Sequence, residues 1–338
     1  MECVRVESGF YMKQRDIFEP REHFKPFDYP ECEQYCDAIG ESYWTHKEWS
    51  FSTDVQEFHT ELTEYERSVI KKCLLLISQI EVSLKTFFLK LGDHLPKPEI
   101  YMVGATFAES EVRHERAYSH LLELLGLNDE FEKIYDIPAV IDRHNYLKKY
   151  KEFSNARLEE RFLRSIILFS LFIENVSLFS QFFIIMSFNK HRKMLKDINN
   201  AVAATSKEEA IHGAFGSFII NELRKEHPEF FTEELEEMIS TFCQKAFIAE
   251  EKVIDWVFDN GDTDFIKVAQ VKEFVKNRFN ASLSGIGFKP IFETDKEILD
   301  KTKWFDEELF SDAHFDFFHQ RPVSYSRKNK AITADDLF

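Results

Sequence analysis

The stretch from Ile166 to Phe188 constrains the fold of this chain most, because it is long and apolar yet carries one formal charge, Glu174. Its length would suffice for a transmembrane helix, which needs about 20 apolar residues. However, an ionised carboxylate is costly at mid-bilayer, and no other segment offers a companion span. We therefore expect a helix at the centre of a large bundle and no membrane partner. There, Glu174 needs a partner of its own.

The composition favours long helices around one large core. Only ten glycines and nine prolines interrupt 338 residues, of which 44% are hydrophobic. Thr63 and Glu66 form a capping-box pattern in front of the first long apolar helix. Helical periodicity predicts an all-α protein with helices over 31–44, 69–91, 100–125, 156–188, 192–227, 232–260 and 265–283.

Three segments are expected along the chain. Residues 1–54 form an N-terminal arm with a short helix, residues 55–310 form the helical domain, and residues 311–338 form a flexible C-terminal tail. The net charge of -17 argues against nucleic acid and anionic lipid as partners. Five cysteines without a paired framework, and an N-terminus with early charges, indicate a cytoplasmic protein.

Two of the histidines share one pattern. Only His114 and His212 have a glutamate three positions earlier, which is Glu111 for His114 and Glu209 for His212. Residues three apart lie on one helix face, so each pair can aim a carboxylate and an imidazole at one point. The helix before each pair carries a glutamate inside an apolar run, Glu81 and Glu174. Each element alone has another interpretation: a solvated Glu-x-x-His face, or a protonated core glutamate. Together and in this order they predict a dinuclear metal site.

This order of ligands resembles that of ferritin-like di-iron and di-manganese proteins, which implies a ferritin-like long-helix bundle with the two metals in its core. The predicted ligands are Glu81, Glu111, His114, Glu174, Glu209 and His212. Four carboxylates with two imidazoles suit iron or manganese better than structural zinc.

A longer motif narrows the class. Residues 110–120, SEVRHERAYSH, resemble the S-E-x-x-H-x-R-x-Y-x-H stretch of class I ribonucleotide reductase small subunits, and the similarity runs from about Phe24 to the C-terminus. The resemblance implies a radical-generating subunit of ribonucleoside-diphosphate reductase that forms a homodimer and works with a large subunit. Tyr118 stands at the family's radical tyrosine. Trp44 and Tyr325 match its relay residues. The last residues, 334–338, resemble its docking peptide.

Two departures bear on the metal. Glu81 stands where the tyrosyl-radical di-iron members usually have aspartate, and Glu208 stands where the family commonly has an aspartate that links the tryptophan to a ligand histidine. In the family, glutamate at the first position is associated with manganese, and retained Tyr118 argues against the manganese–iron subclass. The resemblance thus favours a dimanganese cofactor activated by superoxide, with di-iron or manganese–iron as alternatives.

Two other functions remain open from the sequence. A ferritin-like dinuclear-metal oxidase would share all six ligands without needing a large subunit. A ferritin-like iron-storage protein would form a hollow shell instead of a dimer. The tail distinguishes the first of these from a reductase subunit, since an oxidase has no use for a docking peptide.

Overall fold

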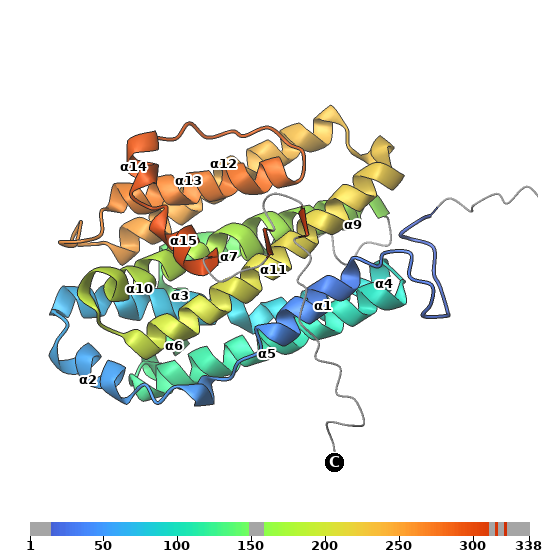
Figure 1. The fold of residues 1–338 in the computed structure, drawn as a ribbon. Coiled ribbons are helices and arrows are strands. Elements are labelled where there is room, and N and C mark those ends of the chain that lie inside the picture. The colour runs from blue at the N-terminus through green and yellow to red at the C-terminus, as the bar shows by residue number, and fades with distance from the viewer. Residues whose placement is uncertain (1–14, 149–158, 311–314, 317–320, 323–338) are drawn as a thin grey trace, which may run out of the picture.

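The computed structural model describes residues 15–148, 159–310, 315–316 and 321–322, and this part of the chain is largely helical (Figure 1). The longer helices are α1 (Cys32–Glu41), α3 (Glu64–Leu89), α5 (Pro98–Leu124), α7 (Pro138–Leu147), α9 (Glu159–Phe169), α10 (Phe179–Arg192), α11 (Lys196–Glu226), α12 (Glu233–Val257) and α13 (Val268–Gly285). The shorter elements are η1 (His46–Glu48), α2 (Ser52–Thr60), α4 (Leu91–His94), α6 (Asn128–Glu132), η2 (Ile134–Asp136), the π-helix η3 (Ser170–Ser177), η4 (Pro228–Phe230), α14 (Lys296–Asp300), α15 (Trp304–Phe310), and the strands β1 (Phe315–Asp316) and β2 (Arg321–Pro322).

Four successive helical segments form the centre of the molecule: α3, α5, the run α9–η3–α10, and α11. Helix α1 packs against α5 and α11 on one side, while α13 packs against η3 and α10 on the other, with α12 beside it and against α7 and α3 (Figure 1). The described part of the arm therefore covers the bundle, and Ile17 and Tyr29 are fully buried in the core. The division into three segments remains a prediction.

Helix boundaries follow the local chemistry of the sequence. The capping box at the start of α3 is present, with the Glu66 N–H donating to Thr63 Oγ1 at 3.2 Å and the Thr63 N–H donating to Glu66 Oε2 at 2.9 Å. Helix α5 begins with Pro98 in its first turn and ends before Gly126, whose φ is 71°. The chain between α10 and α11 reverses through Lys193 and Leu195, which both have positive φ. The helix predicted over 192–227 therefore begins later, at Lys196.

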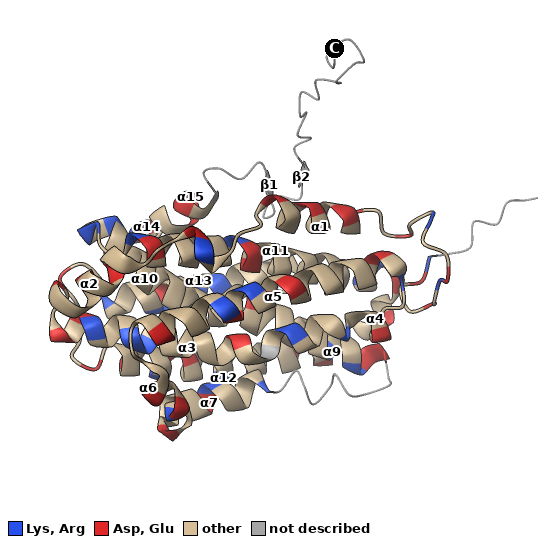
Figure 2. Cartoon of the chain, turned by 90° about the horizontal axis from the view of Figure 1, so that it is seen from below, with Lys and Arg blue, Asp and Glu red and all other residues tan. Residues whose placement is uncertain are grey.

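The apolar stretch that could have crossed a membrane is enclosed in the bundle. The helical run Glu159–Arg192 has a mean hydropathy of 1.7 over its most apolar window, and 89% of that window is buried. Its phenylalanines pack against neighbouring helices, as with the stacked rings of Phe87 and Phe169 at 3.7 Å. Acidic and basic residues are interspersed along the helices on the face in view in Figure 2.

Helices α3 and α5 approach closely at Gly104, where a Cβ would lie 2.6 Å from the backbone oxygen of Phe88. Backbone cannot move aside as a flexible side chain can, so we expect Gly104→Ala to force these two helices apart. Overpacking of this kind costs about 1–3 kcal/mol. Gly40→Ala is the matched control, because a Cβ at Gly40 on α1 meets nothing within 4 Å. The alanine should leave stability unchanged or raise it by up to about 1 kcal/mol through helix propensity.

Thermal unfolding of the metal-free proteins measures both effects. The expected order of midpoints is Gly104→Ala below the parent and Gly40→Ala at or above it. Equal midpoints for Gly104→Ala and the parent would show that the two helices do not depend on this contact.

Candidate metal centre

The structure brings all six predicted ligand side chains together in the core. Their potential ligand atoms form two groups, each with its atoms within 4.8 Å of one another. One group is Glu81, Glu111, His114 and Glu209, and the other is Glu111, Glu174, Glu209 and His212. Glu111 and Glu209 belong to both groups, which is the arrangement that two neighbouring cations with two shared carboxylates require. The sequence contains the pattern of Glu followed by Glu-x-x-His two times, and the fold brings both copies together as the two halves of one site.

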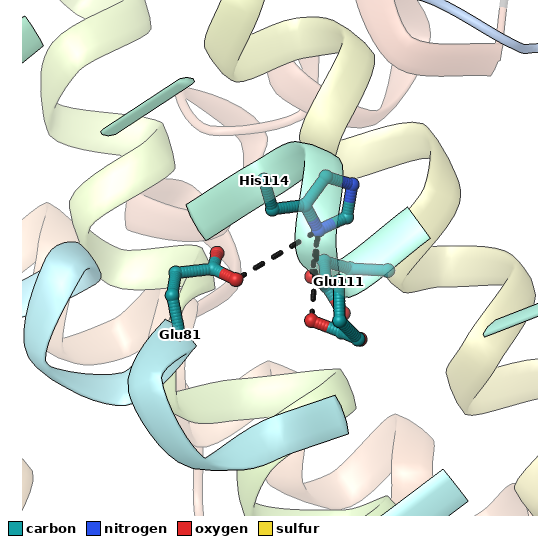
Figure 3. Close-up of side chains that lie close together, drawn as sticks. Glu81, Glu111 and His114 are labelled. Carbon is teal, nitrogen blue, oxygen red and sulfur yellow. Dashed lines mark ion pairs between the residues drawn. The ribbon is translucent and has the colours of Figure 1, made fainter. Parts of the chain in front are cut away.

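Each half draws on three helical segments: α3, α5 and α11 in one half, and η3, α5 and α11 in the other. Figure 3 shows Glu81 of α3 pointing toward Glu111 and His114 of α5. His114 Nδ1 lies 3.9 Å from Glu81 Oε2 and 3.1 Å from Glu209 Oε1. In the other half, His212 Nδ1 lies 3.0 Å from Glu111 Oε1, 3.2 Å from Glu209 Oε2 and 3.4 Å from Glu174 Oε2.

Both imidazoles present the same nitrogen to the site. Their Nδ1 atoms face the carboxylates, while their Nε2 atoms face outward. His114 Nε2 lies 2.7 Å from Glu208 Oε2, and His212 Nε2 lies 2.9 Å from Ser110 Oγ, whose own hydroxyl donates to the Phe107 carbonyl. These partners accept the Nε2–H of each ring, so a lone pair remains on Nδ1. Outer partners of this kind fix the tautomer and ring orientation of metal-binding histidines.

Glu174 lies on a π-helical segment that the sequence analysis missed, since it predicted one regular helix over 156–188. Carbonyl groups of this segment are bonded by side chains. The Asn175 carbonyl accepts from Arg278 Nε at 2.8 Å, and the buried Arg143 donates to the Ser177 carbonyl and pairs with Glu250. A π-helical turn commonly marks a functional site. Here it sets the position of the Glu174 carboxylate.

Two glycines of α11 make room for this segment. A Cβ at Gly213 would lie 2.5 Å from Asn175 Oδ1, and a Cβ at Gly216 would lie 2.4 Å from Ser170 Oγ. Glycine at these two positions therefore lets α11 lie directly against η3. The two glycines are three residues apart on the helix that also carries His212. This spacing is the sequence signal that could have indicated a close helix contact there.

Buried polar atoms in the site have no hydrogen-bond partner among the described residues. They include both carboxylate oxygens of Glu81, Glu111 and Glu174, together with Glu209 Oε1 and His114 Nδ1. All six ligand residues are at most 1% exposed. Unpaired buried oxygens are costly, and native proteins almost always satisfy them. Cations bound between these carboxylates would satisfy them, so the residues present fit a dinuclear metal centre.

The pKa shifts show the same need for positive charge. Burial raises the pKa of Glu81 and Glu174 well above the usual value, and nearby carboxylates add to the effect. Burial lowers the pKa of His114 and His212, but their hydrogen bonds to carboxylates outweigh it and leave both pKa values well above the ordinary range. For Glu209, hydrogen bonds outweigh burial and lower the pKa. Without cations the site holds protons, which metal binding displaces.

Tyr118 lies in the core next to this cluster. It is 1% exposed, and its hydroxyl donates to Thr205 Oγ1 at 3.1 Å. Burial, with the charge of Glu81 as a further cause, raises the pKa of the phenol. Tyr118 is therefore a neutral phenol, and its acceptor among the described residues is another hydroxyl.

Trp44 lies beyond the end of α1, which the sequence analysis had extended to residue 44 but which ends at Glu41. Its ring is 3% exposed and stacks on His114 with centroids 5.8 Å apart and planes at 19°. Glu208 does not connect the two as the family's aspartate would. Its carboxylate accepts from His114 Nε2 and from Arg113 Nη1 at 3.0 Å, while the Trp44 Nε1–H has no partner among the described residues. Tyr325 and residues 334–338 lie outside the described residues.

A model of the family "Ribonucleotide reductase, small chain" matches residues 21–298. The chain belongs to this family. It is 26% identical over 97% of its length to a probable ribonucleoside-diphosphate reductase small subunit of Invertebrate iridescent virus 3, 89% of which is covered. It is 21% identical to the ribonucleoside-diphosphate reductase subunit beta of Treponema pallidum, with 93% of this chain and 90% of that protein covered.

Solved structures share the fold of this ribonucleotide reductase small chain. The R2 subunit from Clostridium botulinum superposes with a TM-score of 0.76 at 20% identity, covering 84% of this chain and 90% of that one. Dimanganese(II)-NrdF from Streptococcus sanguinis gives a TM-score of 0.73 at 15% identity, covering 85% and 99%. The predicted bundle and the reductase assignment are confirmed. The chain is a small subunit of ribonucleoside-diphosphate reductase, the radical-generating subunit, which works with a large subunit.

Proposed function

We propose that this small subunit holds two metal ions, one against Glu81 and His114 and one against Glu174 and His212, with Glu111 and Glu209 shared. The observation that carries this proposal is the membership of both shared glutamates in both ligand groups. When bound, such a metal pair supplies a one-electron oxidant. The buried chain around it excludes water, because the ligand residues are at most 1% exposed.

We further propose that the metals are manganese. Glu81 supports this choice because glutamate at the first ligand position resembles the manganese-containing members of the family. The structural neighbour from Streptococcus sanguinis contains dimanganese(II), which agrees with the choice. Iron in both positions, or one ion of each, would use the same donors. Metal analysis of the protein from its own cells, coupled to ribonucleoside-diphosphate reduction with its large subunit, tests the function and the metal together.

In this proposal Trp44 and Tyr325 carry an electron from the large subunit toward the metal site. The stacked contact of Trp44 with His114 supports the inner step. Glu208 positions His114 through the Nε2 hydrogen bond and is held by the Arg113 guanidinium. The electron comes from a cysteine thiol of the large subunit, which loses its proton there and becomes the thiyl radical that begins ribonucleotide reduction.

The proposed homodimer would form through the outer face of α3 and α5. Large apolar side chains are exposed on both helices, including Val82 and Leu89 on α3 and Tyr101 and Val112 on α5. Exposed apolar residues on two neighbouring helices support a protein contact there. We place the working complex in the cytoplasm, where reduced cysteines such as Cys36 and Cys243 persist.

Tyr118→Phe tests where the oxidising equivalent is stored. Oxidation of tyrosine releases the phenol proton, and the Tyr118 hydroxyl bonds the neutral Thr205 hydroxyl instead of a carboxylate. We therefore expect an oxidant stored on the metals. After loading with manganese and exposure to superoxide, electron paramagnetic resonance should show a mixed-valent metal signal. The variant should keep its turnover within about twofold of the parent, which is less than about 0.5 kcal/mol in activation free energy.

Thr205→Val provides a matched control, because it removes the hydroxyl partner and keeps the side-chain shape. A tyrosyl signal in the parent, with activity lost in a Tyr118→Phe protein that still loads and oxidises its metals, would contradict storage on the metals. The reductase function itself would survive that outcome.

A further inference from the structure

Trp49 lies directly beside Trp44 because a single helical turn separates them. The turn is η1 (His46–Glu48), and a capping box closes it. The Thr45 N–H donates to Glu48 Oε1 at 2.8 Å, and the Glu48 N–H donates to the Thr45 carbonyl at 3.1 Å. The chain thereby folds back and brings the two indole rings to 5.3 Å between centroids, with planes at 46°. The contact is part of a built local structure.

The two indoles continue a line of rings from the metal site. His114 stacks on Trp44, and Trp44 contacts Trp49. Trp44 is buried, whereas Trp49 is half-buried at the edge of the core. Beyond Trp49 the next ring in the described part of the chain is Phe51, 6.3 Å away, whose benzene ring is much harder to oxidise than an indole. The oxidisable series therefore reaches the surface at Trp49.

The surroundings of Trp44 favour transfer of an electron without a proton. Its Nε1–H has no acceptor in the described part of the chain, and the nearby Glu208 carboxylate is engaged by His114, Arg113 and Ser42. No base among the described residues is in place to take the indole proton. Oxidised Trp44 therefore stays a radical cation, which is a stronger oxidant than the neutral radical and can oxidise a second indole in contact with it.

Tyr43 is the other aromatic side chain next to Trp44 that could serve as the exit. It is 57% exposed, and the Arg113 guanidinium lies 4.6 Å from its ring centroid and 6.0 Å from that of Trp44. This fixed cation opposes a second positive charge on the tyrosine ring. Tyrosine must also release its proton on oxidation. Arg113 lies farther from the Trp44 ring than from the Tyr43 ring, and oxidation of Trp49 to its radical cation releases no proton.

We propose that Trp49 is a second electron carrier, through which electrons from outside the bundle reach Trp44. The inference rests on the proposed function of the metal site and of Trp44. In each transfer, Trp44 has first lost one electron to the metal site. The oxidised Trp44 then takes one electron from Trp49. Trp44 is thereby reduced, Trp49 becomes the radical cation, and no bond forms or breaks. Trp49 then takes an electron from the next donor, ultimately the large subunit's cysteine thiol, which gives up its proton to solvent or to a base there.

The test compares two reductants on the oxidised, metal-loaded small subunit without the large subunit. Hexaammineruthenium(II) is a cation that an acidic protein attracts but whose charge keeps it out of the core, so its electrons need a route through side chains. Hydroxyurea is small and uncharged and can reach the buried site directly. The decay of the metal signal in electron paramagnetic resonance gives the rate for each. Trp49→Phe should slow the ruthenium rate at least about tenfold and leave the hydroxyurea rate unchanged.

Two further variants fix the interpretation. Trp49→Tyr, which restores an oxidisable ring, should recover most of the ruthenium rate. Trp256→Phe changes a tryptophan of α12 outside this series of rings and should alter neither rate. A loosened structure would speed the hydroxyurea reaction, so that reaction reports on folding in every variant.

The inference fails if Trp49→Phe keeps the parent's ruthenium rate, or if both rates change together in Trp49→Phe and Trp49→Tyr. Failure of the proposed function would be recognised from the parent chain. It would then show no redox-active metal signal and no reductase turnover with its large subunit.

Discussion

Glu111→Ala should remove both metal ions and reduce ribonucleotide reductase turnover at least about 100-fold, the upper range for loss of a single group that supports a bound metal. Glu111 belongs to both ligand groups, so its removal leaves each cation with one carboxylate fewer. Glu81→Ala and His212→Ala each affect one group only. We therefore expect about two ions per chain in the parent, fewer than one in Glu111→Ala, and an intermediate content in the two single-group variants.

Metal analysis of the purified proteins measures these differences. Glu115→Ala is the matched control, because Glu115 lies one turn further along α5 and pairs with Lys85 at the surface instead of facing the site. It should bind as much metal as the parent. The metal-free Glu111→Ala protein should fold as well as the metal-free parent, since the change removes a buried carboxylate that has no hydrogen-bond partner in the described chain. Unchanged metal content in Glu111→Ala would refute the assignment of Glu111 as a shared ligand.

The geometry of the site could be predicted from sequence wherever helical periodicity alone determines it. The pairs Glu111 with His114 and Glu209 with His212 share a face on any regular helix, so three-residue spacing was sufficient. Glu81 and Glu174 were recognisable because a lone carboxylate in an apolar run must find a partner. The sequence did not indicate which carboxylates are shared. That depends on how four helices meet, and Glu111 and Glu209 belong to both groups only in the assembled bundle.

The π-helical segment could not be predicted, because its cause is tertiary. Glu174 lies in a largely apolar run, and nothing in that run indicates a change of hydrogen-bond register. Residues of other helices stabilise this hydrogen-bond register. Arg143 and Arg278 donate hydrogen bonds to carbonyl groups of the π-helical segment, and Gly213 allows α11 to lie close to Asn175. Each of these lies more than 25 residues from Glu174 in the sequence.

The surroundings of Trp44 show a second limit of sequence comparison. The resemblance placed Trp44 near a ligand histidine, and in the structure its ring stacks on that of His114. At position 208 the family commonly has an aspartate that links the tryptophan and the histidine. The longer glutamate side chain instead bonds His114 and Arg113 and leaves the indole N–H without a partner in the described chain. One added methylene thus changes the hydrogen bonding of a matched position.

Truncation after Tyr325 should abolish reductase turnover while leaving the metal site intact. The deleted residues 326–338 end in Asp335, Asp336, Leu337 and Phe338, two acids followed by two large apolar residues, and resemble the family's docking peptide. A few such anchors commonly carry most of the affinity of an interface, at about 2–4 kcal/mol each. Loss of about 3 kcal/mol weakens binding more than 100-fold. The truncated chain keeps Tyr325 itself, so the deletion separates docking from electron transfer.

Metal analysis, spectroscopy and peptide competition distinguish docking from damage to the site. Metal content and the electron paramagnetic resonance signal of the truncated chain should match those of the parent, because the ligands lie between Glu81 and His212, far from the deletion in sequence. A synthetic peptide of residues 326–338 should inhibit the parent by competing for the large subunit. The same peptide with Leu337→Ala and Phe338→Ala should not, since the apolar anchors are missing. A truncated chain with full turnover would show that the tail does not dock, whereas a redox-active chain that never supports reductase turnover, even at full length, would favour the uncoupled oxidase.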